Sequence, residues 1–182
     1  MMSIQLHYQE AIKFATYRHL AKKQTVKGTT LPYVVHLSNV AMELFVAAMH
    51  TFDFDLDYAV QVALLHDTVE DTDTTIGEVN DLFGADIAEG VMALTKNENL
   101  PVDEQIPDSL KRTKKLRKEA WAVKLADRIT NLQPPPSFWD KSKILNYMEV
   151  SKVILDELRE GNEYLADRLG KVIDDYAKYV TG

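Results

Sequence analysis

The segment from Leu56 to Val69 constrains the fold more than any other part of the sequence, because apolar side chains lie nearly all round the helix that it predicts. They belong to Val60, Val62, Ala63, Leu64 and Leu65. A helix with no polar face is buried at the centre of a domain, where other helices must cover it. The chain has 182 residues, which suffices for one domain that buries roughly 70% of the surface exposed on unfolding. We therefore predict a single domain over residues 1–182, organised around this helix.

Most of the remaining chain also has helical periodicity. Pro32 is placed to open a helix, Thr75 and Glu78 form a capping box, and Gly161 separates the last two helices. The other predicted helices span residues 11–19, 32–46, 75–84, 86–95, 109–132, 141–159 and 163–180, and residues 96–108 are expected to form a loop. No segment alternates convincingly between polar and apolar residues as a strand would, so the predicted fold class is all-α.

The composition excludes several kinds of function. Without cysteine, the chain has no disulfides, thiolate zinc sites or cysteine nucleophiles, so any metal must be held by His, Asp, Glu or Asn. The net charge of −7 disfavours nucleic-acid binding, which needs cationic surface. No apolar run approaches the roughly 18 residues that span a bilayer, and the N-terminus does not resemble a signal peptide. We expect a cytoplasmic protein with no membrane partner, and leave its oligomeric state open.

An adjacent histidine and aspartate, His66 and Asp67, follow the buried helix and are the most informative pair in the chain. Neighbouring helical side chains diverge by about 100°, so the two share one ion only near a helix end or bend, and other donors must complete the shell. His36 and Asp127 are the candidates. Asp127 lies in an apolar helix, where a carboxylate is costly unless it binds a cation or forms an ion pair, for example with Lys124 or Arg128.

Three stretches of the sequence resemble the metal-dependent HD-domain hydrolases, specifically the alarmone hydrolases of the Rel/Spo type in their small single-domain form. The match covers most of the chain. The stretches are Lys27-Gly28-Thr29 with Pro32-Tyr33-Val34-Val35-His36, Ala63-Leu64-Leu65-His66-Asp67-Thr68-Val69-Glu70-Asp71-Thr72, and Val123-Lys124-Leu125-Ala126-Asp127-Arg128 with Asn131-Leu132.

The resemblance implies a helical HD-domain fold with a metal site in the helix core. It implies one Mn²⁺, or another first-row ion, held by His36, His66, Asp67 and Asp127. It further implies that the 3′-pyrophosphate of guanosine 3′,5′-bis(diphosphate) (ppGpp), or of its 5′-triphosphate relative (pppGpp), is hydrolysed to give GDP or GTP and pyrophosphate. Such a site leaves ligand positions for water and a phosphate oxygen.

The resemblance also implies roles outside the metal shell. Glu70 and Asp71 would orient or deprotonate the attacking water, with an acidic loop cap as the alternative for both. The expected substrate contacts are Lys27, Lys124, Arg128, Asn131, Lys143 and Tyr147, with a helix C-cap as the alternative for Asn131 and core packing as the alternative for Tyr147.

Two features leave the substrate open. Six cations between Lys111 and Lys118 could attract a polyanion or simply form a solvated helix face. Val26 stands where many Rel/Spo-type relatives have a basic residue, so a phosphate contact is missing there. The alternatives are therefore an HD-domain phosphohydrolase for another nucleotide, or a nucleotide sensor without catalysis. His19 receives no role.

Overall fold

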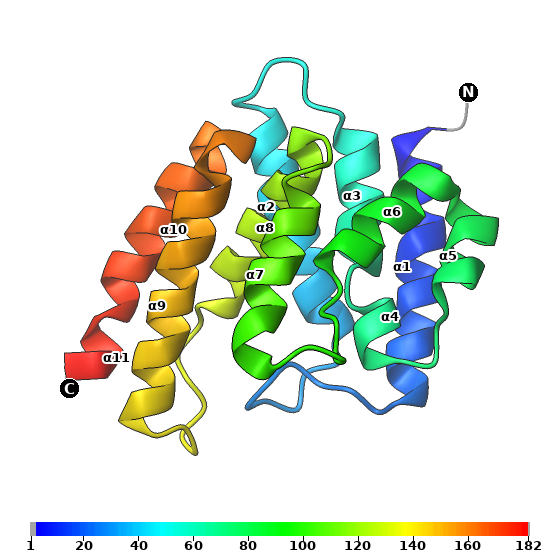
Figure 1. The fold of residues 1–182 in the computed structure, drawn as a ribbon. Coiled ribbons are helices and arrows are strands. Elements are labelled where there is room, and N and C mark those ends of the chain that lie inside the picture. Colours follow the sequence, from blue (N-terminus) through cyan, green and yellow to red (C-terminus); the bar gives the residue numbers. More distant parts are fainter. Residues whose placement is uncertain (1–2, 182) are drawn as a thin grey trace.

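The computed structural model describes residues 3–181, and these form helices joined by short connections (Figure 1). The α-helices are α1 (Ile4–Ala21), α2 (Val34–Ala48), α3 (Leu56–Leu65), α4 (Thr68–Asp71), α5 (Ile76–Phe83), α6 (Ala85–Leu94), α7 (Val102–Thr113), α8 (Lys118–Asn131), α9 (Lys141–Leu158), α10 (Glu163–Tyr176) and α11 (Lys178–Thr181), with a 3₁₀ turn η1 (Arg159–Gly161). No strand occurs within residues 3–181, where the isolated bridge between Thr25 and Pro32 is the nearest approach to one. The all-α prediction is confirmed.

Helix α3 lies at the centre of the molecule, as its apolar composition predicts. Every residue from Tyr58 to Leu65 is buried, and α1, α2, α6 and α8 all pack against it. In Figure 1, α9 and α10 form an antiparallel pair on one side of the α2 and α8 pair, with α1, α5 and α6 on the other side. Three helices of this core, α2, α3 and α8, therefore bring their side chains to a common region.

The predicted helix over residues 56–69 is wrong at its C-terminal end, because α3 stops at Leu65 and a separate turn, α4, begins at Thr68. Local side chains satisfy the backbone at this break. The His66 imidazole Nδ1 lies 2.7 Å from the Ala63 carbonyl oxygen, and the Thr68 hydroxyl donates to the Leu65 carbonyl over 2.7 Å. The break therefore falls at the His66–Asp67 pair.

The predicted loop at 96–108 and continuous helix at 109–132 are also wrong. Helix α7 starts directly after Pro101 and accommodates Pro107 in its interior. It ends at Thr113, and an extended Arg117 separates it from α8. The indole of Trp121 donates to the Leu116 carbonyl over 3.2 Å, which satisfies a backbone group in the tight turn. Tertiary packing thus overrides the uninterrupted helical pattern.

Smaller differences concern helix ends. Helix α1 is longer than predicted, α2 starts at Val34 rather than at Pro32, and the last segment divides into α10 and α11. The Thr75–Glu78 capping box is present, and Gly84 ends α5 with a positive φ of 90°. No helix in the described part of the chain is both long and apolar enough to cross a membrane.

Candidate metal centre and substrate cleft

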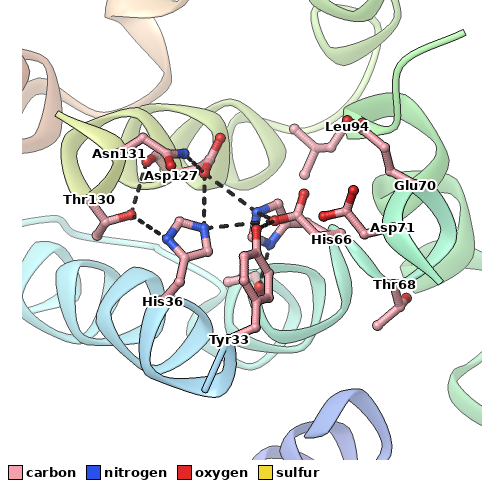
Figure 2. Close-up of polar contacts among 12 residues, drawn as sticks. Tyr33, His36, His66, Thr68, Glu70, Asp71, Leu94, Asp127, Thr130 and Asn131 are labelled. Atoms are coloured by element: carbon pink, nitrogen blue, oxygen red, sulfur yellow. Dashed lines mark hydrogen bonds and ion pairs between the residues drawn. The ribbon is translucent and has the colours of Figure 1, made fainter. Parts of the chain in front are cut away.

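Four predicted metal ligands lie together although they come from three separate parts of the chain. Figure 2 labels three of them, His36, His66 and Asp127. His36 is in the first turn of α2, His66 and Asp67 are at the break between α3 and α4, and Asp127 is in α8. The His36 Nε2 atom lies 3.3 Å from Asp127 Oδ1 and 3.8 Å from Asp67 Oδ2. The His66 Nε2 atom lies 3.0 Å from Asp67 Oδ2 and 3.5 Å from Asp127 Oδ1.

Each imidazole ring makes a contact through Nδ1 that orients its Nε2 atom toward the carboxylates. His66 Nδ1 contacts the Ala63 carbonyl, and His36 Nδ1 lies 3.3 Å from the Thr130 hydroxyl oxygen. The Thr130 hydroxyl donates to the Asp127 carbonyl over 2.9 Å. Its oxygen is thus left to accept from His36 Nδ1–H, which leaves the Nε2 lone pair free.

The carboxylates are held from their outer sides as well. The Tyr33 hydroxyl donates to Asp67 Oδ2. The Asn131 amide donates to Asp127 Oδ1 over 2.5 Å, and the Lys124 ammonium lies 3.7 Å from Asp127 Oδ2. Hydrogen bonds of this kind fix the orientation of metal-ligating side chains.

The cluster strongly perturbs the pKa values of its members. Burial alone would lower the pKa of His66, but the charge of Asp67, followed by Asp127, raises it well above its usual value. Burial alone would raise the pKa of Asp127, yet the imidazoles of His36 and His66 and the Lys124 ammonium hold it well below its usual range. In the absence of a metal, a proton on the His66 imidazole thus compensates the buried carboxylates.

The donor set suits a divalent metal ion. The Nε2 atoms of His36 and His66 are buried without a hydrogen-bond partner in the described part of the chain. One donor atom each from His36, His66 and Asp67 lie within 4.8 Å of one another, and Asp127 Oδ1 lies beside both imidazoles. Two imidazole nitrogens with carboxylate oxygens are typical ligands of first-row divalent ions.

The two acidic residues of α4 occupy different environments. Both Glu70 oxygens are engaged by Lys96, one by its ammonium and the other by its backbone N–H over 2.9 Å. The Asp71 side chain is directed toward the metal ligands in Figure 2, and its Oδ2 accepts from the Gln24 amide over 2.7 Å. Burial, together with the nearby charge of Asp67, raises the Asp71 pKa.

A cleft of about 560 Å³ opens beside the metal ligands and contains several of the predicted substrate contacts. Lys27, Lys124, Arg128, Asn131 and Tyr147 line it, whereas Lys143 does not. Lys143 instead lies next to the cleft, with its Nζ atom 5.0 Å from the centre of the Trp139 ring, on which Lys27 Nζ also packs at 5.0 Å. The Arg128 guanidinium stacks on Tyr147 at 4.6 Å, and its Nε and Nη1 atoms have no hydrogen-bond partner among the described residues.

Several lining residues were not anticipated from the sequence. Lys96, Trp139, Gln24 and Tyr33 all contribute to the cleft. Lys96 follows the end of α6 in a segment expected to be a loop, and its contact with Glu70 of α4 joins residues 26 positions apart. Tyr33 could have been suggested by its place in the first resembling stretch, whereas no local signal identifies Trp139.

The basic stretch lies elsewhere, which favours the alternative that it forms a solvated helix face. None of its residues lines the cleft. Arg112 pairs with Asp108, Lys114 with Glu157, and Lys118 with Glu160. Lys114 and Lys118 therefore form exposed ion pairs, as residues of a solvated helix face do.

Comparison with known proteins agrees with the fold. A family model described as an HD domain matches residues 11–141. The chain therefore belongs to the HD-domain family. Among its relatives is the guanosine-3′,5′-bis(diphosphate) 3′-pyrophosphohydrolase MESH1 of Danio rerio, which is 32% identical over 165 residues and covers 88% of both chains. The Homo sapiens MESH1 protein is 33% identical over 165 residues, covering 88% of this chain and 89% of its own.

Solved structures show the same likeness. The structure of a metazoan ortholog of SpoT, described as hydrolysing ppGpp, superimposes with a TM-score of 0.79 at 29% identity and covers 93% of this chain and 94% of its own. The Listeria monocytogenes protein lmo0812 has a TM-score of 0.64 at 23% identity, covering 81% of this chain and 99% of its own. At that identity the second likeness concerns the fold alone.

Proposed function

We propose that this protein is a metal-dependent pyrophosphohydrolase that converts ppGpp or pppGpp and water to GDP or GTP and pyrophosphate. One observation carries the proposal: buried imidazole and carboxylate donors converge at one end of a cleft that Lys27, Lys96, Lys124 and Arg128 line. A divalent cation beside a cationic cleft matches a substrate with two diphosphate groups. The names of the MESH1 relatives support the same substrate.

The proposed metal ligands are His36, His66, Asp67 and Asp127, and the proposed ion is Mn²⁺. The donor set alone would suit other first-row ions equally well. When bound, such an ion supplies positive charge that polarises a phosphate and favours deprotonation of water. The outer hydrogen bonds from Thr130, Asn131 and Tyr33 keep the ligands oriented.

Asp71 is the residue that we propose to hold the attacking water and accept its proton. Its carboxylate is directed toward the cluster, and burial raises its pKa toward the range in which a carboxylate is a better base. Glu70 has both oxygens bonded to Lys96, so its part in handling water requires that ion pair to open. We propose that Glu70 acts mainly by placing the Lys96 ammonium at the cleft.

The cations and aromatic residues would hold the substrate. Lys27, Lys96, Lys124 and Arg128 are placed to neutralise phosphates, and the unpartnered Arg128 nitrogens are free to donate to a phosphate oxygen. Asn131 would contact the substrate beside Asp127. Tyr147 and Trp139 offer ring faces for a base, with Lys143 at the edge of the cleft.

The direct test is hydrolysis of ppGpp with and without Mn²⁺ by protein first stripped of metal. We expect pyrophosphate and GDP in equal amounts, only with metal. A panel with 3′-phosphorylated and cyclic nucleotides tests the substrate, because Val26 also lines the cleft and offers no charge. Binding of ppGpp without pyrophosphate release at full metal occupancy would show a sensor instead.

A second measurement separates metal binding from chemistry. Asp71→Asn should keep Mn²⁺ affinity near that of the wild type and lose about 100-fold or more in kcat, the usual scale for removing a general base. Asp127→Asn should lose metal affinity first, because a coordinating carboxylate neutralises part of the ion's charge. Normal turnover by metal-saturated Asp71→Asn would assign Asp71 to the helix cap.

A further inference from the structure

A buried histidine near the end of α1, His19, has no part in the proposed mechanism but is joined to it by two hydrogen bonds. Its side chain is almost fully buried. Nδ1 lies 2.6 Å from Gln24 Oε1, and Gln24 Nε2 donates to Asp71 Oδ2 over 2.7 Å. We infer that His19 is a positioning residue, which through the Gln24 amide fixes the orientation of the Asp71 carboxylate. This inference rests on the proposed function, since it deepens the role of Asp71.

The backbone already places Gln24 beside His19. After α1, Lys23 takes a left-handed conformation with φ 54°, and the chain turns back so that the Gln24 backbone N–H donates to the His19 carbonyl over 3.1 Å. The Gln24 carbonyl in turn accepts from the Tyr33 backbone N–H over 3.3 Å. With the main chain fixed, the remaining freedom of Gln24 lies in its side-chain torsions, which the hydrogen bonds to His19 and Asp71 restrict.

The chemistry of the three groups determines the direction of both hydrogen bonds. An ionised Asp71 carboxylate only accepts, so Gln24 must turn its NH₂ group toward Asp71 and its carbonyl oxygen toward His19. His19 must then donate from Nδ1–H. Burial lowers the pKa of His19, which favours a neutral ring, and Nε2 has no hydrogen-bond partner among the described residues. The arrangement therefore requires the tautomer with its proton on Nδ1.

The same ring supports a metal ligand from its other side. His19 packs against Tyr33, with ring centres 4.6 Å apart and an angle of 40° between the planes, and the Tyr33 hydroxyl donates to Asp67. Replacing the imidazole with a phenyl ring keeps an aromatic ring beside Tyr33 and removes the donor to Gln24. His19→Phe is thus a specific probe of the hydrogen bond.

A purely structural role for His19, tying α1 to α4, makes a different prediction. Lys22 already connects the end of α1 to this region through an exposed ion pair with Asp73, with Nζ and Oδ1 2.6 Å apart. This pair touches no carboxylate in the cleft. Lys22→Met is therefore a matched control that weakens the connection without altering the His19–Gln24–Asp71 chain.

The first experiment needs neither substrate nor metal. Nitrogen-15 chemical shifts of the His19 ring in the full-length protein report which nitrogen carries the proton. We expect a neutral ring protonated at Nδ1 at pH 7. A neutral ring protonated at Nε2 would overturn the inference, because Gln24 could then not present its amide to Asp71 while bonded to His19.

The second experiment measures ppGpp hydrolysis at saturating Mn²⁺. His19→Phe and Gln24→Met should each lower kcat about 10- to 100-fold, the range for outer-shell partners of an active site, and the double variant should lose little more than either single variant. KM and the Mn²⁺ dissociation constant should stay within about twofold of the wild type. His19→Asn should recover most of kcat, because its amide N–H can occupy the position of Nδ1–H.

The outcomes separate the inference from the proposed function. Suppose that the wild type hydrolyses ppGpp. If His19→Phe then has the kcat of the wild type, or if Lys22→Met loses as much kcat as His19→Phe, the positioning role is overturned and the hydrolase proposal stands. If the wild type releases no pyrophosphate from ppGpp, the proposed function is overturned. The catalytic role of His19 in positioning Asp71 is then overturned as well. Loss of metal affinity in His19→Phe would also contradict the inference, because it would place the effect at Asp67.

Discussion

At the scale of single residues, the metal centre depends on hydrogen bonds that determine which imidazole nitrogen is free. Ala63 accepts from His66 with its carbonyl, and Thr130 fixes His36 with its hydroxyl. The Thr130 hydroxyl donates its proton to the Asp127 carbonyl in a hydrogen bond. One threonine therefore links two of the proposed ligands. Such outer partners contribute to metal affinity although they never touch the ion.

We predict that Thr130→Val weakens Mn²⁺ binding by about 10-fold or more, because His36 then loses the partner that keeps Nε2 unprotonated and aimed at the ion. Thr130→Ser keeps the hydroxyl and should bind Mn²⁺ almost as the wild type does. Calorimetric titration of metal into both variants measures the difference. Equal affinities for Thr130→Val and Thr130→Ser would mean that the hydroxyl is not needed.

At the scale of elements, breaks between helices decide where charge is placed. The interruption between α7 and α8 directs the basic stretch to exposed acidic partners, whereas Lys96, after α6, reaches Glu70 and the cleft. Nearness in sequence to a motif is thus a poor guide to which lysine meets the substrate.

We predict opposite effects for the two groups of lysines. The double variant Lys114→Glu with Lys115→Glu should leave KM for ppGpp within about twofold at low salt, because these residues do not line the cleft. Lys96→Met should raise KM about 10-fold, the equivalent of one charged hydrogen bond to phosphate. Steady-state kinetics at 50 and 200 mM salt would measure KM for both variants. A raised KM in the Lys114→Glu, Lys115→Glu variant would show that the basic stretch contributes to substrate binding.

Close approach between elements also depends on a glycine. A Cβ atom at Gly161 would lie 2.5 Å from the Trp121 Cβ and 3.3 Å from the Ala122 nitrogen, so η1 packs on α8 only without a side chain. We predict that Gly161→Ala lowers the free energy of unfolding by about 1–3 kcal/mol through overpacking. In contrast, Gly170 lies inside α10, and a Cβ atom there would have its nearest neighbour 3.8 Å away. Gly170→Ala should therefore raise the free energy of unfolding by about 0.5–1 kcal/mol. Urea denaturation of both variants is the measurement.

At the scale of the whole molecule, metal binding and folding are coupled, because the ligands come from α2, α8 and the break between α3 and α4. A metal that binds only the folded state adds about 2.7 kcal/mol to the free energy of unfolding when its free concentration is 100 times its dissociation constant. For a chain of this length that corresponds to a rise in Tm of roughly 5–11 °C. Chelation should reverse the rise.

The pKa shifts predict how this stabilisation varies with pH. The folded-state pKa of His66 is raised, so its contribution to the stability of metal-free protein is complete below the unfolded pKa of about 6.5 and is lost as pH rises through the raised value. We expect metal-free protein to have a higher Tm at pH 6 than at pH 8. Mn²⁺ must displace the His66 proton, so the gain in Tm on adding metal should be larger at pH 8.

Calorimetry at both pH values, with and without Mn²⁺, tests this prediction. His66→Asn, which removes the titrating imidazole, should show a smaller difference in Tm between pH 6 and pH 8 in metal-free protein. A metal-free wild type that becomes more stable toward pH 8 would contradict the assigned direction.

Three features could be predicted without the structure: the helical class, the central position of the apolar helix around Val60 and Leu65, and the candidates His36, His66, Asp67 and Asp127. These follow from local properties: the periodicity of apolar residues, the cost of burying a carboxylate, and the order of three motifs. Such features are encoded within a few turns of chain, so no knowledge of distant contacts is required.

Other features are visible only in the folded structure: the exact end of α3 at Leu65, the start of α7 at Val102, the ion pair of Lys96 with Glu70, and the connection of His19 through Gln24 to Asp71. The contacts of Lys96 with Glu70 and of Gln24 with Asp71 join residues 26 and 47 positions apart. At the helix boundaries, the free energy gained by packing and by satisfying buried polar groups exceeds the weak local preference for continuing a helix. For that reason the basic stretch, conspicuous in the sequence, lies outside the cleft, whereas an inconspicuous lysine lines it.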